Sequence, residues 1–344
     1  MKPALLSLLF ATAAGMAHAG PELTYDDLAR RLYDLKRLAT PPATGEKTGS
    51  ATSGDRASRY DAASDSYIDW YANNDGSGFV RREGDGIVAA ELEGPGVIWR
   101  IWSAKPESGP VQFFIDGAPQ PVLDVPFNRL FDAVKGPFPF KELVRDLAKG
   151  WNCFVPIPYQ KSCRVVLGKG WGSYYQITST KFPAGTTVPS FRGTLNDGEK
   201  AALTRAGHMW AQRNTPLPPA GGEVIEATLT LEPGQSVDVA RMDSPRAIRG
   251  LICSVAETEA TAMERTLREL TLSIHWDGEA SPGVWAPLGD FFGSAPGFNP
   301  YRSLPCGMTR DGMYASWYMP FEKAIVRLSN DGLWPRAVTC KILL

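Results

Sequence analysis

Residues 276–292 decide the fold and read Trp276-Asp277-Gly278-Glu279-Ala280-Ser281-Pro282-Gly283-Val284-Trp285-Ala286-Pro287-Leu288-Gly289-Asp290-Phe291-Phe292. A diverged copy occurs earlier in the chain. It begins Ile115-Asp116-Gly117-Ala118 and continues to Pro126-Phe127-Asn128-Arg129-Leu130-Phe131. The shared Asp, Pro and closing Phe keep one offset, because 277−116, 287−126 and 292−131 each equal 161. A constant offset across such a block indicates an internal repeat.

The repeat extends in both directions. Upstream, Gly94-Pro95-Gly96-Val97-Ile98-Trp99-Arg100-Ile101-Trp102 corresponds to residues 244–252 at an offset of 150 (245−95). Downstream, Val155-Pro156-Ile157-Pro158-Tyr159-Gln160-Lys161-Ser162 corresponds to residues 317–324 at an offset of 162 (320−158). The chain therefore contains two copies of one domain. The second copy carries about eleven extra residues near Glu257 to Glu269, which predict a loop or short helix between strands.

Short runs of aromatic and β-branched residues, separated by Asp-Gly, Gly-Pro-Gly and Pro, predict strands in both copies. Long helical patterns do not alternate with these runs, which disfavours a parallel α/β sheet. We predict an all-β protein of tandem jelly-roll β-sandwiches, with an N-terminal helix and one inter-repeat helix. Its predicted parts are, in chain order, a signal peptide 1–19, an N-terminal helix and polar loop 20–66, a first jelly roll 67–190, a linker with helix 191–222 and a second jelly roll 223–344.

Helical and loop segments flank these strands. Leucines recurring from Leu23 to Leu38 predict one amphipathic helix. Residues 43–66 are rich in Gly, Ser, Thr, Ala and Asp, so they predict a loop or an arm. Residues 196–213 predict the inter-repeat helix, and residues 168–172 predict a hairpin turn rather than a phosphate loop.

The composition and the N-terminus restrict location and partners. The 344 residues include 36 basic and 37 acidic ones, so the chain presents no cationic field for nucleic acid. Met1-Lys2, the apolar run from Ala4 to Met16 and Ala17-His18-Ala19 are typical of a secretory signal peptide cleaved after Ala19. No later run approaches the length of a membrane span. We therefore expect a secreted or periplasmic protein.

Cysteine and histidine patterns predict no metal or cofactor. The five cysteines favour buried small side chains, with a Cys153–Cys163 disulfide as the alternative if the two residues face each other across paired strands. His208 and His275 remain after removal of the signal peptide. We interpret both as structural, because the sequence offers no further partners for a zinc site or a Ser-His-Asp triad.

Carboxylates beside aromatic residues are the candidates for chemistry. Glu279 and Asp290 occur only in the second copy, since the first has Ala118 and Arg129 at these places. If the segment between them folds back, the two acids face one cleft, as glycoside hydrolysis requires. Asp277-Gly278 is interpreted as a tight turn that both copies share. The flat aromatic faces on which sugar rings stack are predicted to come from Trp276, Trp285 and Phe292.

Four motifs together resemble one known family. They are residues 93–102 (Glu93 to Trp102), Trp276-Asp277-Gly278-Glu279, Pro287-Leu288-Gly289-Asp290-Phe291-Phe292 and Met319-Pro320-Phe321-Glu322-Lys323-Ala324. Over nearly the whole mature chain the sequence resembles glycoside hydrolase family 172, first catalogued as a domain-of-unknown-function family. The resemblance implies tandem jelly rolls in a homo-oligomer, a trimer or a higher assembly. It also implies retaining hydrolysis or transfer of α-linked furanosides, such as D-fructofuranosides and D-arabinofuranosides, by two glutamates without metal or cofactor.

The sequence departs from this family at the catalytic motifs. The family's glutamates lie in a Gly-Glu-Gly-Asp-Glu stretch and a Gly-Thr-Gly-Thr-Glu-Asp-Tyr stretch, and this sequence contains neither. Gly289 stands at the matching place. Longer relatives carry both stretches in a further jelly roll, so this chain is expected to be either complete without them or truncated relative to those relatives. No catalytic residue is carried over from the family.

Two hypotheses about function follow. The first is an exported furanosidase-like glycoside hydrolase in which Glu279 and Asp290 line the sugar site. The second is a non-catalytic glycan-binding or assembly module of the same fold. The second predicts that Glu279 and Asp290 lie apart or in turns, whereas a shared open cleft would favour the first.

Overall fold

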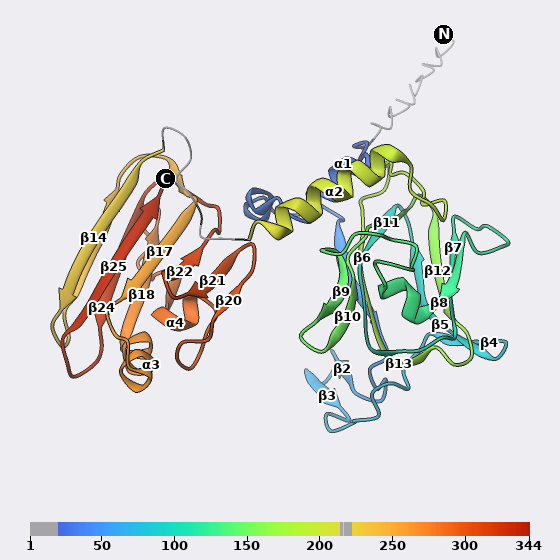
Figure 1. Ribbon diagram of the computed structural model, residues 1–344, viewed down its shortest axis with the longest axis horizontal. Coiled ribbons are helices and arrows are strands. Elements are labelled where there is room, and N and C mark those ends of the chain that lie inside the picture. The colour runs from blue at the N-terminus through green and yellow to red at the C-terminus, as the bar shows by residue number, and fades with distance from the viewer. Residues whose placement is uncertain (1–19, 214–215, 217–221) are drawn as a thin grey trace, which may run out of the picture. The chain divides into compact units, whose positions relative to one another are not determined.

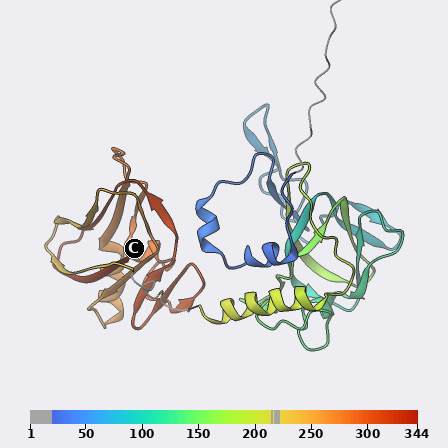
Figure 2. The same ribbon diagram turned by 90° about the horizontal axis from the view of Figure 1, so that it is seen from above.

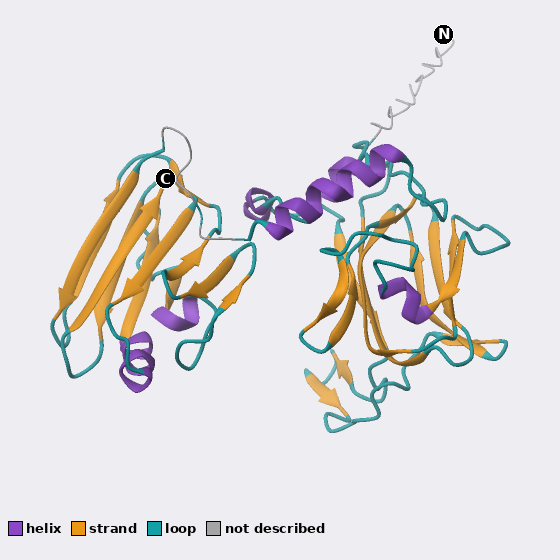
Figure 3. Ribbon diagram, in the orientation of Figure 1, coloured by secondary structure: helices purple, strands orange, loops and turns teal. Residues whose placement is uncertain are grey.

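The computed structural model describes residues 20–213, 216 and 222–344, and the chain divides into two compact units (Figure 1). Unit 1 contains the residues up to Tyr25, Ala43–Phe131 and Asp146–Thr194. Unit 2 contains Asp26–Pro42, Asp132–Arg145 and Leu195–Leu344. Each unit holds a β-sandwich of antiparallel sheets (Figure 3). The predicted signal peptide lies outside the described residues.

The sandwich of unit 1 is built from two sheets. One runs in the order β1-β13-β6-β10-β9, with β11 also paired to β6, and the other runs β4-β5-β12-β7-β8. The strands of the first sheet are β1 (Lys47–Thr52), β6 (Gly96–Pro106), β9 (Val144–Leu147), β10 (Gly150–Cys153), β11 (Ile157–Tyr159) and β13 (Gly172–Lys181). Those of the second are β4 (Arg81–Glu83), β5 (Gly86–Glu93), β7 (Pro110–Ile115), β8 (Leu123–Pro126) and β12 (Ser162–Leu167). A separate hairpin pairs β2 (Arg59–Asp61) with β3 (Ser66–Ile68), and a 3₁₀ turn, η2, spans Phe127–Phe131.

Unit 2 repeats this architecture. Its sheets run β14-β25-β17-β22-β21-β20 and β15-β24-β18-β19, and β16 pairs with β23. The strands of the first sheet are β14 (Val224–Leu231), β17 (Gly250–Val255), β20 (Tyr301–Arg302), β21 (Cys306–Thr309), β22 (Gly312–Ala315) and β25 (Arg336–Leu343). The others are β15 (Ser236–Met242), β16 (Arg246–Ile248), β18 (Leu270–Trp276), β19 (Val284–Pro287), β23 (Met319–Phe321) and β24 (Ala324–Asn330). The helices are α1 (Tyr25–Arg30), η1 (Leu35–Ala39), α2 (Asp197–Ala211), α3 (Ala260–Glu269) and α4 (Leu288–Phe291).

Period-two alternation in β24 shows how the sequence sets the two faces of this sheet. Ala324, Val326 and Leu328 are buried in the core, whereas Ile325 and Arg327 between them are only partly buried. Successive side chains of a strand point to opposite faces, so Ile325 and Arg327 belong to the outer face of the β15-β24-β18-β19 sheet. The candidate site described below lies on this outer face.

Two equivalent turns confirm that the two sandwiches are copies of one fold. Asp116 follows β7 and accepts hydrogen bonds on Oδ1 from the backbone N–H groups of Lys161 (2.6 Å) and Ser162 (3.1 Å). Asp277 follows β18 and accepts the equivalent pair from Glu322 (2.7 Å) and Lys323 (2.9 Å). Both aspartates have positive φ, 54° and 51°. The tight-turn interpretation of Asp277-Gly278 is therefore confirmed.

Several helical predictions match the structure and one does not. The inter-repeat helix is α2, which Asn196 begins through a capping box with Glu199. The insertion predicted near Glu257 to Glu269 forms α3. The single helix predicted from Leu23 to Leu38 is wrong, because α1 ends at Arg30. The Asp34 carboxylate then accepts from the backbone N–H groups that follow it and starts the separate 3₁₀ helix η1.

Two loop predictions are also corrected. Residues 43–66 contain β1, which pairs with β13, and the strand β2 of the hairpin. They were not predicted as strands because β1 is polar and mostly exposed, so it lacks an apolar alternation. Residues 168–172 connect β12 to β13, which lie in different sheets, so this turn crosses between sheets and is not a hairpin turn. The cysteines are free and, except for the partly exposed Cys306, buried.

Candidate functional site

Glu279 and Asp290 occupy separate surroundings in unit 2. Glu279 is an exposed residue of the turn between β18 and β19, where its backbone N–H donates to the carbonyl of Trp276 at 2.8 Å. Asp290 lies on α4 and forms an ion pair with Arg268 of α3. The buried Oδ1 atom of Asp290 has no hydrogen-bond partner among the described residues. The structure does not bring the two acids together in one pocket.

The three predicted sugar-stacking residues differ in how exposed their side chains are. Phe292 is 0% exposed in the core of unit 2, so it presents no face to a ligand there. The ring of Trp276 stacks on Phe321 with centroids 5.9 Å apart, and Gly283 lies so close to its indole that a Cβ would come within 2.6 Å. Trp285, on the edge strand β19, is 70% exposed and keeps an open aromatic face.

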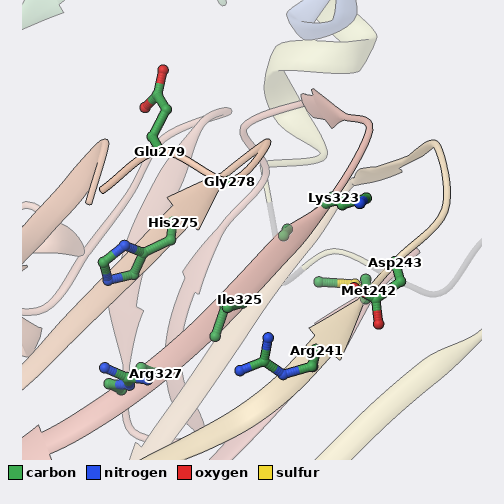
Figure 4. A pocket seen from close by; sticks show the side chains of 10 residues that line it. Arg241, Met242, Asp243, His275, Gly278, Glu279, Lys323, Ile325 and Arg327 are labelled. Atoms are coloured by element: carbon green, nitrogen blue, oxygen red, sulfur yellow. The ribbon is translucent and has the colours of Figure 1, made fainter. Parts of the chain in front are cut away.

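An open hollow of about 380 Å³ lies on the outer face of the β15-β24-β18 part of this sheet, beside the Asp277-Gly278 turn (Figure 4). Figure 4 shows Glu279 and Asp243 at opposite sides of the hollow, with the Glu279 carboxylate pointing away from His275 and Ile325. The side chains that line it come from β15, β18, β24 and the turns next to them: Arg241, Met242, Asp243, His275, Gly278, Glu279, Lys323, Ala324, Ile325 and Arg327. Asp290 is not one of these lining residues.

One carboxylate holds two arginines of the hollow in place. Asp238 accepts from Nε of Arg327 at 2.7 Å and from a terminal nitrogen of Arg241 at 3.1 Å. The hydrogen bond from Arg327 is the main reason that the pKa of Asp238 is lowered, and the same contact raises the pKa of Arg327. A guanidinium carries several N–H donors, so these contacts fix the arginines while others of their donors can bind a ligand.

The hollow therefore combines cationic donors with carboxylate acceptors around a small apolar floor. Arg241, Arg327 and Lys323 supply N–H donors, Glu279 and Asp243 supply acceptors, and Ile325 is apolar. A ligand with many hydroxyl groups needs both donors and acceptors, because each hydroxyl donates one hydrogen bond and accepts others. The volume lies in the range of small-molecule sites, about 300–1,000 Å³.

Most of this hollow was not predicted from the sequence. His275 was interpreted as structural, and its side chain lines the hollow. His208 is exposed on α2, where Nε2 contacts Gln212 at 2.7 Å. Arg241 and Arg327 are ordinary outward-facing residues of alternating strands, so no sequence pattern distinguishes them.

Unit 1 has a hollow of about 450 Å³ at the equivalent position, beside Asp116-Gly117. The strand registers match Phe114 to His275, because Phe114 pairs with Arg164 as His275 pairs with Ile325. In unit 1 the Arg164 guanidinium lies 4.0 Å from the Phe114 ring centroid and forms an ion pair with Glu83. In this first hollow the guanidinium group of Arg164 therefore contacts two other side chains of the protein.

The described residues contain no group of three or more His, Cys, Asp or Glu side chains that could hold a metal ion. Within the same residues, none of the helices is long and apolar enough to cross a membrane.

The fold and the hollow define a class of protein, a tandem jelly-roll β-sandwich with a polar outer-face site. Family models name the family: residues 44–199 match the GH172 first β-sandwich domain, and residues 221–335 match the GH172 domain-like model. The chain belongs to the GH172 family and is a carbohydrate-active, glycoside hydrolase-like protein.

Solved structures show only distant similarity. A structure of Sulfolobus turreted icosahedral virus is 10% identical, with a TM-score of 0.23 over 77% of this chain and 87% of that chain. A crystal structure of the STIV MCP is 9% identical, with a TM-score of 0.21 over 86% and 96% of the two chains. Vicilin from Corylus avellana (hazelnut) is 9% identical, with a TM-score of 0.16 over 74% and 73%. No curated protein matches the chain.

Proposed function

We propose that this chain is an exported glycan-binding protein that recognises α-linked furanosides in the hollow of unit 2 without cleaving them. The observation that carries the proposal is the separation of the two candidate acids. Glu279 lies at the hollow, whereas Asp290 is paired with Arg268 outside it. A retaining glycosidase needs two carboxyl groups about 5–5.5 Å apart on one substrate, so the separate surroundings of Glu279 and Asp290 support binding without cleavage.

The side chains of the hollow assign roles in binding. The guanidinium groups of Arg241 and Arg327 donate to hydroxyl and ring oxygens of the sugar, while Glu279 accepts from a sugar hydroxyl. Ile325 contacts the C–H groups of the furanose ring. The nearby Trp285, which is exposed, can stack on a further sugar residue. The α-furanoside preference itself rests on the family resemblance.

A second candidate function is hydrolysis of the same furanosides by Glu279 and Asp243. The observation that favours it is that both carboxylates line one hollow and stand on opposite sides of it (Figure 4). In this case one carboxyl group would protonate the leaving oxygen and the other would attack the anomeric carbon or activate water.

One set of measurements separates these functions. Calorimetry with methyl α-D-arabinofuranoside and methyl α-D-fructofuranoside should detect binding, and Glu279→Gln should weaken it by about tenfold or more, because it removes a charged acceptor. The matched control is Asp290→Asn, which should leave the affinity unchanged. Release of a phenol from an aryl α-D-arabinofuranoside by the wild-type protein would establish the second function instead, provided that both Glu279→Gln and Asp243→Asn abolish it. A wild-type protein that neither binds nor cleaves these glycosides would refute both.

Export is tested separately. Expression of the full chain in a Gram-negative host, followed by N-terminal sequencing of the periplasmic and medium fractions, should give a product that begins at Gly20. A product that keeps Met1 and stays in the cytoplasm would refute export without affecting the binding proposal.

A further inference from the structure

The β2–β3 hairpin of unit 1 carries aromatic side chains that take no part in the hollow described above. In Figures 1 and 2 the hairpin projects from the sandwich of unit 1, and its strands pair with each other in a sheet of their own. Tyr60 lies directly opposite Tyr67, with ring centroids 5.4 Å apart. Tyr67 in turn contacts Trp70, with centroids 5.1 Å apart. These three rings form a continuous row, which we call the aromatic row.

The aromatic row is exposed. The exposed fractions are 53% for Tyr60, 56% for Tyr67 and 63% for Trp70, and the next residue, Tyr71, is 92% exposed. Large apolar side chains that gather on a surface mark interaction sites more often than chance, whereas single exposed ones need no explanation. The exposure of the aromatic row and of Tyr71 therefore requires a physical explanation.

Stability of the hairpin explains only part of the row. A short two-stranded hairpin is marginal alone, and the cross-strand Tyr60–Tyr67 pair stabilises it. Trp70 and Tyr71 lie beyond the end of β3, in a turn closed by the bond from Ala72 N–H to the Asp69 carbonyl at 2.9 Å. Tyr71 is 92% exposed, so little of its apolar surface contributes to the stability of the hairpin.

Carboxylates and hydroxyls surround the rings. The Tyr60 hydroxyl donates to Asp65 at 2.6 Å, and the Ser64 hydroxyl donates to Asp61 at 2.6 Å. From Arg59 to Tyr71 the chain contains three aspartates and one arginine, so the hairpin is net acidic. This charge opposes nucleic acid and anionic lipid. Aromatic faces together with acidic acceptors are complementary to a neutral sugar chain, whose C–H faces stack on rings and whose hydroxyls donate to carboxylates.

We propose that the aromatic row and Tyr71 form a second carbohydrate-binding site, which takes a chain of neutral sugar residues rather than a single ring. The rings lie 5.4 and 5.1 Å apart and pack edge to face, with interplanar angles of 61° and 65°, so their faces point in different directions and one monosaccharide can stack on only one of them. The choice of α-furanosides as the sugar class rests on the function proposed above. The hairpin thus holds a polymer or oligosaccharide, and the hollow of unit 2 recognises a single residue.

The test uses calorimetry on the full mature chain with two probes, a hexasaccharide of α-linked D-arabinofuranose and methyl α-D-arabinofuranoside. Trp70→Ala and Tyr71→Ala should each weaken the hexasaccharide by about two- to tenfold, the range expected for one aromatic contact. Both variants should leave the methyl glycoside unaffected. The matched control is Trp334→Ala, because Trp334 is 65% exposed in unit 2 and belongs to neither site. Tyr71 is so exposed that its replacement should not unfold the hairpin, which keeps the test valid if Trp70→Ala does.

The outcomes separate this proposal from the function it rests on. Unchanged hexasaccharide affinity in both hairpin variants, together with loss of binding in Glu279→Gln, would overturn the second site and leave the hollow intact. Weakened hexasaccharide binding in the hairpin variants, with Glu279→Gln unaffected, would support the second site and refute the hollow. No binding of either probe to the wild-type chain would overturn both. A shift in sedimentation coefficient without a change in affinity would assign the row to contact between copies of the chain and refute the proposal.

Discussion

Replacing Asp277 by alanine tests whether the Asp-Gly turn supports the sandwich of unit 2. Its Oδ1 accepts two backbone hydrogen bonds, from Glu322 at 2.7 Å and Lys323 at 2.9 Å, and its φ is 51°. A hydrogen bond to a charged group contributes about 1.5–3 kcal/mol, and an alanine at positive φ costs about 1–2 kcal/mol. Because Asp277 is exposed, water replaces part of the loss. We therefore expect Asp277→Ala to lower the free energy of unfolding by about 2–3 kcal/mol.

Urea unfolding of three variants provides the assay and its controls. Asp277→Asn keeps a side-chain acceptor and tolerates positive φ, so it should lose no more than about 1 kcal/mol. Asp116→Ala removes the equivalent turn of unit 1, where Asp116 also accepts from the Ser190 hydroxyl, and should cost more than Asp277→Ala. Burial alone would raise the pKa of Asp116, yet these hydrogen bonds outweigh it and lower the pKa. Equal stability of Asp277→Ala and Asp277→Asn would refute the reasoning.

Three further predictions concern unit 2. The hydrogen bond from Arg327 lowers the pKa of Asp238, so its stabilisation is present above the ordinary value of 3.8 and is lost as pH falls through the lowered pKa. Thermal denaturation below pH 3.8 should show this loss, and Asp238→Asn should be less sensitive to pH there. Phe292→Ala should cost about 3–5 kcal/mol in urea unfolding, because the side chain is 0% exposed, and a loss below about 1 kcal/mol would contradict its place in the core. Cys253 and Cys340 are buried and lie directly opposite each other on the paired strands β17 and β25, so refolding with oxidised glutathione should link them. Peptide mapping that finds only free thiols would count against this pairing.

The constant sequence offset predicted the fold because it marks a position that few residue types can occupy. Asp116 and Asp277 both combine positive φ with two hydrogen bonds from backbone N–H groups to the side-chain Oδ1, a combination that only aspartate or asparagine satisfies easily. The structure adds a second equivalence, since β5 and β15 each contain a bulge, at Ala89 and Val239. Their offset is again 150 (239−89), but a bulge constrains the backbone rather than side-chain type, so the sequence alone did not indicate it.

The candidate site was harder to predict than the fold, because its residues come together only through the order of the strands in the sheet. β15, β24 and β18 are neighbours in space although long stretches of chain separate them, so Arg241 and Arg327 meet at Asp238 only after folding. The aromatic residues near the repeat block were visible in the sequence, but hydrophobicity does not say which of them are buried. Phe292 is 0% exposed in the core, whereas Trp285 is 70% exposed on the edge strand β19.

The two copies share the turn and differ in what they place beside it, which points to a division of roles. Asp116 and Asp277 hold the same hydrogen bonds, whereas Ala118 stands where Glu279 does. In unit 1 the Arg164 guanidinium is covered by Phe114 and paired with Glu83, so the protein itself uses its binding capacity. In unit 2 Arg241 and Arg327 share the Asp238 carboxylate, and Glu279 and Asp243 also line the hollow. Equivalent Asp-Gly turns can therefore stabilise both sandwiches while different polar side chains line the two hollows.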